Sequence, residues 1–170
     1  MKRILQAAGL LLCSSLAPAN TLGAESPFQR FELTPMTYVA TQAGRNEVVL
    51  QATYARYEPD TNEIALRDFT AVMSDANGEE TFELSATKGR IDLDTSAFVA
   101  EGTVRGETED GRRLETEHMV YEQSTGQVST KSPVLIREGS VAYRGGKGFV
   151  YEVRKGRFRL LGGASVEQQK

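Results

Sequence analysis

The sequence predicts an all-β protein built from repeated antiparallel hairpins. Four stretches share one pattern: an apolar or aromatic residue, a polar turn, and then two apolar or small residues at alternate positions. They are YEPDTNEIAL (57–66), IDLDTSAFVA (91–100), YEQSTGQVST (121–130) and YEVRKGRFRL (151–160), whose starts lie 34, 30 and 30 residues apart. Periods of this length are typical of repeat architectures. Alternation of apolar and polar residues favours half-buried strands, and no segment carries a long helical period.

The first 24 residues read as a secretory signal peptide. Lys2 and Arg3 precede a short apolar run, and small residues suited to cleavage end at Ala19 and at Ala24. We expect cleavage after one of these, with Ala24 favoured, or retention of the segment as a membrane anchor. The run is interrupted and shorter than the roughly 20 apolar residues of a membrane helix. Cys13 lacks the small residue expected before a lipidated cysteine, and the remaining chain has no cysteine for a disulfide.

The rest, residues 25–170, is predicted to be a single β-domain of about ten to twelve strands. Its first strand is expected at 36–42 (MTYVATQ). A long strand is expected at 80–93, returning at 97–107 after the polar turn DTS. Asn77-Gly78, just before this pair, is the strongest short-range hairpin signal. The last predicted strand covers 157–167 (RFRLLGGASVE).

Three of the predicted strands carry an irregular apolar spacing. In LQATYARY (50–57) the apolar residues follow steps of two, three and two, and the same steps recur at 84–91 and 114–121. An extra residue in an alternating strand predicts a β-bulge, which bends the strand. RGGKG (144–148) is predicted to be a bend as well, because no helix follows it to complete a phosphate-binding loop.

The residue inventory offers little catalytic chemistry. His118 is the only histidine. It lies at one of the positions in its predicted strand where polar side chains alternate with apolar ones, so it is expected to face solvent. Asp92 and Asp94, like Glu79 and Glu80, lie at turns, where carboxylates commonly bond the local backbone. We therefore predict no catalytic residue, no metal site and no cofactor. An enzyme on a β-scaffold is the weakest of the function classes that we consider.

The repeated motifs resemble those of one transport family. The marks are LxAxxAxYxPDTNxxxL, FxAEGxV, LETExMxY and a later GxGFxYE, and the resemblance covers about residues 36–166. The chain is similar to the periplasmic bridge proteins of lipopolysaccharide export, the OstA-like family of LptC and LptA, and most similar to LptC. The resemblance implies a β-taco or β-jellyroll, an open folded sheet with a hydrophobic trough. From the residues alone, a closed β-sandwich is also a possible fold.

The resemblance also implies a task and partners. The task is to shield lipopolysaccharide acyl chains in the periplasm, between an inner-membrane ATP-binding-cassette transporter and a further β-taco domain of the LptA type. No nucleic-acid partner is expected. LptC relatives usually keep an N-terminal anchor, whereas this leader reads as cleavable. A free, LptA-like bridge subunit therefore stays open as an alternative, and so does a structural β-repeat protein with no ligand.

The strand phase selects the residues expected to line the trough. These are Leu50, Tyr57, Leu84, Ile91, Phe98, Leu114, Met119, Tyr121, Val134, Phe149 and Leu160. Small inward residues such as Ala86 and Gly89 lie among them and are expected to leave volume. An empty volume in a core is costly, whereas an acyl chain that fills it contributes about 0.8 kcal/mol per buried CH₂.

The two ends of the sheet are expected to join partner domains. Residues 25–128 carry 9 Lys+Arg and 20 Asp+Glu, a net charge of −11, whereas residues 129–170 carry 9 and 3, a net of +6. We expect edge-strand pairing in which a basic C-terminal edge meets an acidic N-terminal edge of a partner, with charge orienting the encounter. The predicted edge residues are Tyr38, Arg157, Arg159, Leu160 and Ala164.

Overall fold

A computed structural model of the chain describes residues 31–168, so the leader with its two candidate cleavage points lies outside the described residues. Within that range the chain forms one antiparallel sheet of 13 strands. The strands are β1 (Glu32–Leu33), β2 (Met36–Gln42), β3 (Arg45–Glu58), β4 (Glu63–Ser74), β5 (Glu80–Asp92), β6 (Phe98–Thr108), β7 (Arg113–Glu122), β8 (Gln127–Thr130), β9 (Val134–Glu138), β10 (Val141–Gly145), β11 (Phe149–Glu152), β12 (Arg157–Leu160) and β13 (Ala164–Gln168). A single turn of 3-10 helix, η1 (Val153–Lys155), joins β11 to β12.

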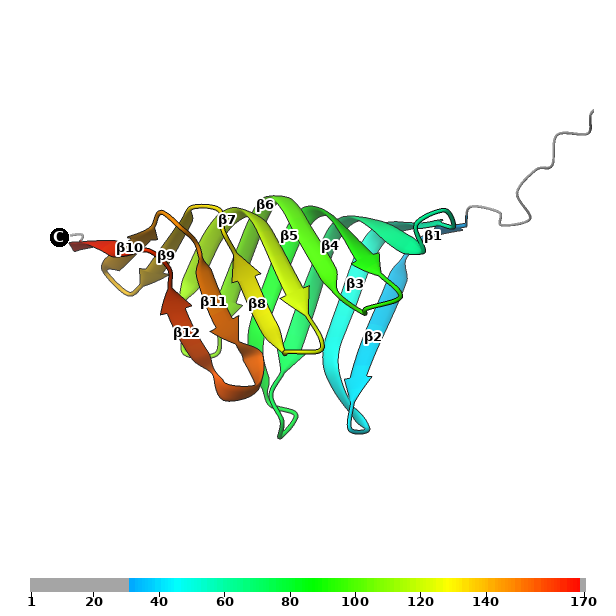
Figure 1. Cartoon of the computed structure of the whole chain (residues 1–170), viewed down its shortest axis with the longest axis horizontal. Helices are drawn as coiled ribbons and strands as arrows, with labels where there is room; N and C mark the ends of the chain where they lie inside the picture. Colours follow the sequence, from blue (N-terminus) through cyan, green and yellow to red (C-terminus); the bar gives the residue numbers. More distant parts are fainter. Residues whose placement is uncertain (1–30, 169–170) are drawn as a thin grey trace, which may run out of the picture.

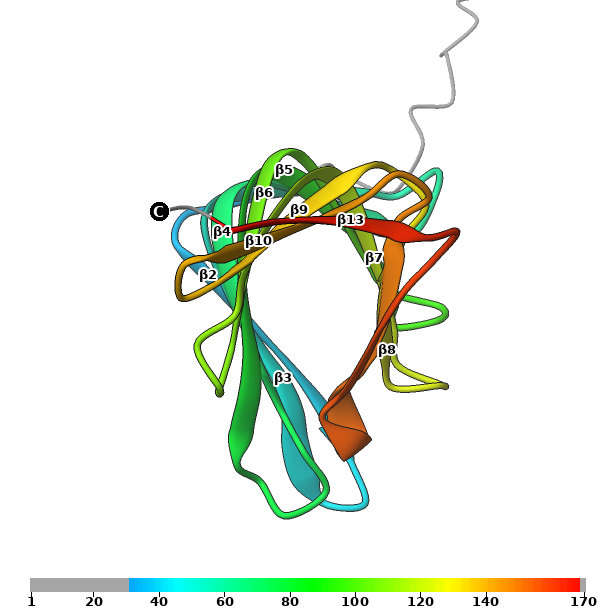
Figure 2. The same cartoon turned by 90° about the vertical axis from the view of Figure 1, so that its left-hand side faces the viewer.

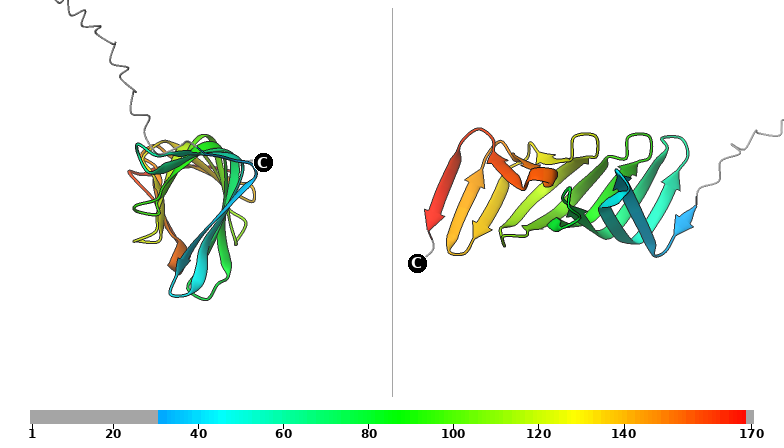
Figure 3. Two further views of the ribbon diagram at one scale, coloured as in Figure 1. Left: turned by 90° about the vertical axis from the view of Figure 1, so that its right-hand side faces the viewer. Right: turned by 90° about the horizontal axis from the view of Figure 1, so that it is seen from below.

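All four predicted hairpins form, and they share one register. In each hairpin the residue before the turn pairs with the residue seven positions later. The pairs are Tyr57–Ile64, Ile91–Phe98, Tyr121–Val128 and Tyr151–Phe158. The prediction of an all-β chain of repeated hairpins is therefore confirmed. The strands follow one another along the long axis, with the N-terminal strands at one end and the C-terminal strands at the other (Figures 1 and 3).

The irregular spacing marks the place where the long strands bend. The register shifts between Ala86 and Lys88 on the β5–β6 pair and between Glu101 and Val104 on the β6–β7 pair, as a bulge requires. The β3–β4 pair differs, because its register stays constant. There β4 makes a matching change of phase, with exposed Arg67 and Asp68 between two buried residues. A simple bulge in β3 was therefore the wrong prediction.

These changes of phase line up across neighbouring strands. We call the line the crease; it passes through Thr53, Asp68, Thr87, Gly102 and Glu117. Each long strand crosses the crease and so contributes to two facing walls, as the view along the long axis shows (Figure 2). The first wall contains β2 and the start of β3. The second wall contains the end of β3 and the start of β4.

The sheet forks after β7. Arg113–Glu115 of β7 pair with β9, whereas Val120–Glu122 of the same strand pair with β8. One limb, β9–β10–β13, continues the first wall, and the other limb, β8–β11–β12, continues the second. RGGKG carries the chain from β10 in one limb to β11 in the other, which confirms the predicted bend. Gly148 in this bend has φ of 86°, and a Cβ there would lie 1.9 Å from the carbonyl oxygen of Thr130.

The C-terminal segment differs from its prediction. The expected single strand at 157–167 is two strands, β12 and β13, which lie in different limbs. Gly162 and Gly163 separate them with φ of 71° and 91°. Two successive residues in this left-handed region cannot continue an extended strand. The chain therefore leaves one wall here and pairs with β10 of the other.

Candidate functional site

An apolar interior lies between the two walls. Inward side chains from the long strands and from both limbs form a single buried cluster. Nine of the eleven residues predicted to line a trough belong to it, each at most 3% exposed: Leu50, Leu84, Ile91, Phe98, Leu114, Met119, Tyr121, Val134 and Phe149. The structure thus brings together residues that lie up to about a hundred positions apart.

The other two predicted lining residues are half-buried. Leu160 packs against the cluster at the C-terminal end. There a Cβ on Gly145 would lie 2.7 Å from Leu160 and 3.1 Å from Val134, so the two side chains meet from opposite limbs. Tyr57 lies at the β3–β4 turn, where its hydroxyl donates a hydrogen bond to Asn62 Oδ1 at 3.1 Å. Tyr57 is therefore placed at the rim of the interior.

Aromatic pairs extend the lining beyond the predicted residues. Phe98 contacts both Phe69 and Tyr121, with ring centroids 6.3 Å and 5.2 Å away. Phe82 and Tyr151 pair across the two walls at 5.2 Å. Phe82 was expected to face inward from its alternation with Leu84 and Ala86, whereas Phe69 and Tyr151 were missing from the predicted lining. Their alternation with polar neighbours was the signal that could have found them.

Ala52 and Ala86 line an open cavity of about 670 Å³, whereas two inward glycines leave no free volume beside them. A Cβ on Gly89 would lie 2.6 Å from the ring of Phe69 and 2.5 Å from the carbonyl oxygen of Val99. A Cβ on Gly106 would lie 2.6 Å from the ring of Phe82. Aromatic rings on neighbouring strands therefore occupy the space beside these glycines.

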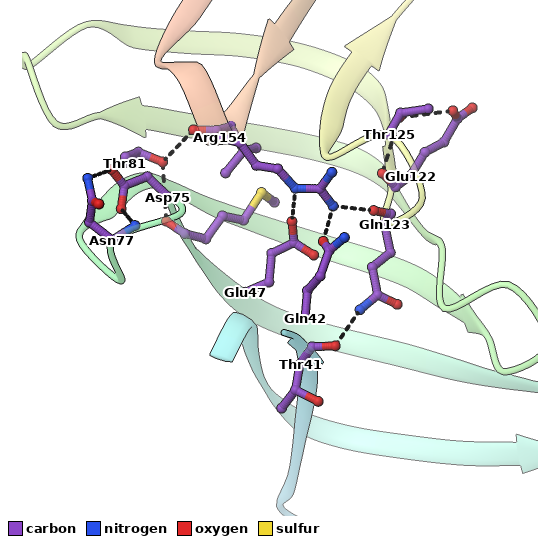
Figure 4. A network of polar contacts seen from close by, with 12 residues as sticks. Thr41, Gln42, Glu47, Asp75, Asn77, Thr81, Glu122, Gln123, Thr125 and Arg154 are labelled. Atoms are coloured by element: carbon purple, nitrogen blue, oxygen red, sulfur yellow. Dashed lines mark hydrogen bonds and ion pairs between the residues drawn. The ribbon is translucent and has the colours of Figure 1, made fainter. Parts of the chain in front are cut away.

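The walls also meet along the side opposite the crease, which we call the seam. Arg154 of η1, on the second wall, forms an ion pair with Glu47 of β3, on the first wall, at 2.6 Å. Its guanidinium also donates hydrogen bonds to the side chain of Gln42 and, at 2.7 Å, to the carbonyl oxygen of Gln123. Gln123 in turn donates to the carbonyl oxygen of Thr41 at 3.2 Å (Figure 4).

A second group of hydrogen bonds closes the seam nearby. The hydroxyl of Tyr151 on β11 donates to the carbonyl oxygen of Thr81 on β5 at 3.1 Å. The hydroxyl of Thr81 donates back to the carbonyl oxygen of Val153 at 3.4 Å. Burial raises the pKa of the Tyr151 hydroxyl, which therefore stays protonated and able to donate. The seam is thus closed by side chains, without a ladder of backbone hydrogen bonds between Arg154 and β3.

Among the described residues, two buried polar atoms at the seam make no hydrogen bond of normal geometry. Glu47 is only 5% exposed, and its Oε2 accepts no such bond. The hydroxyl of Tyr121 is buried and also lacks such a bond. Burial raises the pKa of this hydroxyl, and both the charge of Glu47 and an interaction with the Glu47 side chain raise it further. The two oxygens therefore lie near each other, but they do not form a hydrogen bond of normal geometry. An unpaired buried oxygen is costly, so this part of the seam is held at a free-energy cost.

Each end of the sheet presents unpaired strand edges. At the N-terminal end β1 and β2 both pair only with β3, and at the C-terminal end β12 and β13 are the outermost strands of the two limbs. Four of the five large, exposed apolar side chains of the described residues lie beside these edges: Phe31, Leu33, Val39 and Val166. The large, exposed apolar side chains of the described residues therefore lie mostly at the two ends of the sheet.

The predicted edge residues are divided between these strands. Tyr38 of β2 is half-buried against the core. Arg157 and Arg159 are exposed on β12, and Ala164 is exposed on β13. Glu167 on β13 pairs with Arg144 at 3.6 Å. The basic character is therefore confined to the β12 edge, because the predicted terminal strand is split between the limbs.

Residues 31–168 contain no group of three or more His, Cys, Asp and Glu side chains placed to hold a metal ion. No helix among these residues is long and apolar enough to cross a membrane. His118 is half-buried on β7 opposite Glu101 of β6.

The sequence and the fold both have known relatives. Residues 26–167 match the family model described as lipopolysaccharide-assembly, LptC-related. The chain belongs to this LptC-related family. A solved structure of LptH from Pseudomonas aeruginosa, titled the LptA-homologous periplasmic component of a lipopolysaccharide transport device, has the same fold with a TM-score of 0.53. The two chains are 10% identical, and the alignment covers 72% of this chain and 95% of LptH. A search of curated protein sequences found no match.

The match confirms the family resemblance that the repeated motifs predicted. The match covers almost all of the described residues. The likeness to LptH concerns the fold, an open folded antiparallel sheet of the LptA type.

Proposed function

We propose that this LptC-related protein is a non-enzymatic bridge component that shields lipopolysaccharide acyl chains in the periplasm during their transport to the outer membrane. The interior between the two walls would be the trough that receives the chains. The observation that carries the proposal is the single apolar cluster, which draws side chains from both the N-terminal strands and the two C-terminal limbs. Each CH₂ group placed there contributes about 0.8 kcal/mol, so tail burial would dominate the affinity.

Site-specific photo-crosslinking tests this function. The crosslinker is placed on inward residues Leu84, Phe98 and Phe149 and, as matched controls, on outward residues Glu83 and Glu115 of the same strands or their neighbours. Capture of lipopolysaccharide by the inward set alone is expected, because only these side chains face the interior. Equal capture by both sets would contradict the assignment of the trough.

The free edges support an end-to-end union with β-taco domains of LptA-type and inner-membrane transporter proteins. Backbone pairing would continue each wall into the partner, and the exposed apolar side chains at the ends would be covered. Leu161 donates its N–H to the carbonyl oxygen of Gly148. Because donors alternate along a strand, the N–H of Leu160 points away from β11 and toward the open edge.

A proline at this position tests the union. Leu160→Pro removes an outward donor without removing a bond to β11, so it should weaken partner binding by at least tenfold and leave lipid capture unchanged at Leu84. Leu160→Ala, which keeps the N–H, is the matched control and should bind the partner more tightly than the proline variant. Ala164→Pro is the corresponding change on β13 of the other limb. Proline variants that bind the partner as wild type does would rule out edge pairing.

One structural observation favours a second candidate, a structural β-repeat protein without a ligand. Nine of the eleven predicted lining residues are almost fully buried, as in a dry core. Failure of every inward crosslinker to capture lipid would favour this candidate.

The mode of membrane attachment separates an LptC-like from an LptA-like role. We propose that the leader is cleaved and that the mature chain is periplasmic, starting at Glu25 or Asn20. Mass spectrometry of the protein from the periplasmic fraction tests this, and an intact Met1 in the membrane fraction would favour an anchored, LptC-like subunit.

A further inference from the structure

The seam lies across the path of any lipid that the trough carries, an inference that rests on the proposed function. A lipid with its tails between the walls must keep its polar head in water, because an apolar interior gives a polar head no hydrogen-bond partners. The part of the lipid that links its head to its tails must therefore lie between the walls, on the side of the molecule where no strand connects them. That side is the seam, which is closed in this structure.

Arg154 is the residue that most directly closes this path. It reaches from η1 on the second wall to Glu47 and Gln42 on the first wall, and it holds Gln123 beside them (Figure 4). Since Gln123 also bonds the carbonyl oxygen of Thr41, the contacts form one connected network. A tail could not pass between the walls here without parting Arg154 from Glu47.

The two members of this ion pair differ in their access to water. The side chain of Glu47 is 6% exposed, whereas that of Arg154 is 29% exposed. An anion that approaches from outside therefore meets the guanidinium before it meets the carboxylate. Arginine binds phosphate through paired hydrogen bonds of the kind that it forms with a carboxylate.

We propose that Arg154 closes a gate at the seam, and that an anionic group on the lipid head, such as a sugar phosphate, opens it by replacing Glu47 as the partner of Arg154. Opening of the seam would hydrate Glu47 Oε2 and the hydroxyl of Tyr121, two buried oxygens that make no hydrogen bond of normal geometry in the closed seam. Hydration of these atoms offsets part of the cost of separating the ion pair. Arg154 then selects for lipids whose head carries a negative charge.

Locking the seam tests the gate. Thr41→Cys and Gln123→Cys are introduced together into the full chain with Cys13→Ser, and the cross-link is verified by mass spectrometry. The rate of uptake of fluorescent, phosphorylated lipopolysaccharide should fall at least tenfold in the oxidised protein and recover on reduction. Gln123→Cys alone, treated identically, is the matched control. Equal rates in the locked and reduced forms would overturn the gate and leave the proposed function standing.

The second test concerns the anionic head. Wild type should take up phosphorylated lipopolysaccharide several-fold faster than the dephosphorylated form, and Arg154→Gln should take up both at one rate. Arg113→Gln, which changes an exposed arginine paired with Glu107 on the outer face, should keep the wild-type preference. Glu47→Gln, which keeps Arg154 but removes its charged partner, should speed uptake of both forms. An Arg154→Gln protein that keeps the full preference would overturn anion exchange, and a wild type that takes up neither form would overturn the proposed function itself.

Discussion

The crease and the seam join the same two walls by different means. At the crease every long strand passes from one wall to the other, so the walls are covalently continuous and their backbone ladders resume on both sides. At the seam the walls meet through a few side chains, chiefly those of Arg154 and Tyr151. The difference implies that the walls can separate at the seam while the sheet stays intact at the crease.

The largest expected loss of stability comes from a change in the aromatic packing of the interior between the two walls. Phe98→Ala removes a ring that contacts Phe69 and Tyr121 and should lower the free energy of unfolding by about 3–5 kcal/mol. Leu93→Ala, at a residue 37% exposed, is the control and should change it by less than about 0.5 kcal/mol. Urea unfolding monitored by circular dichroism measures both. A small loss for Phe98→Ala would mean that the interior is loosely packed.

A change beside the crease should come next in size. Gly89→Ala places a Cβ against the ring of Phe69 and against the carbonyl oxygen of Val99, and such overpacking costs about 1–3 kcal/mol. Gly146→Ala is the matched control, since a Cβ there has no neighbour within 4 Å. If both variants were equally stable, the crease would be more adaptable than its backbone contacts indicate.

A change at the seam should have a smaller and more local effect. Tyr151→Phe removes the hydrogen bond to the carbonyl oxygen of Thr81, which still receives the N–H of Glu109. The expected loss is about 1 kcal/mol. Amide exchange should accelerate in β11 and η1 while the strands at the crease keep their protection. Tyr54→Phe, whose hydroxyl bonds exposed Glu32, is the control. Uniform acceleration throughout the sheet would contradict independent opening of the seam.

The smallest effect concerns pH at the β4–β5 turn, on the seam side of the first wall. The N–H of Glu79, followed by that of Asn77, bonds the carboxylate of Asp75 and holds its pKa below the ordinary value of 3.8. A lowered folded-state pKa stabilises the fold above the unfolded pKa, and this contribution disappears as the pH falls through the folded value. Wild type should therefore be slightly more stable than Asp75→Asn at pH 7, with the difference vanishing between about pH 5 and pH 2. If the stability difference between the two proteins persisted in acid, the shape of the Asp75 side chain rather than its charge would account for it.

The sequence predicted the features that local patterns encode. The register of the four hairpins follows from polar turns such as Asp94-Thr95-Ser96 and from alternation on either side, and the bend follows from steps of two, three and two. The fork could not be predicted, because it depends on β7 pairing with two different strands at its two ends. Gly162-Gly163 was visible, but nothing local indicated that β13 would pair with β10.

The contacts at the seam are even harder to predict from local sequence patterns. Arg154 and Glu47 are 107 residues apart in the chain. In the sequence Arg154 is one of a run of basic residues near the C-terminus, which indicated an exposed edge. Only the folded sheet shows that η1 turns this one arginine toward the opposite wall, whereas Arg157 and Arg159 remain exposed on β12.

The hairpin repeat also determines the length of the molecule. Neighbouring strands are about 4.8 Å apart, so each hairpin of roughly thirty residues lengthens the molecule by about 10 Å. A chain of this architecture can therefore reach farther by gaining whole hairpins, without any change in the cross-section that its walls enclose. The length of one chain of this architecture is therefore set by the number of its hairpins.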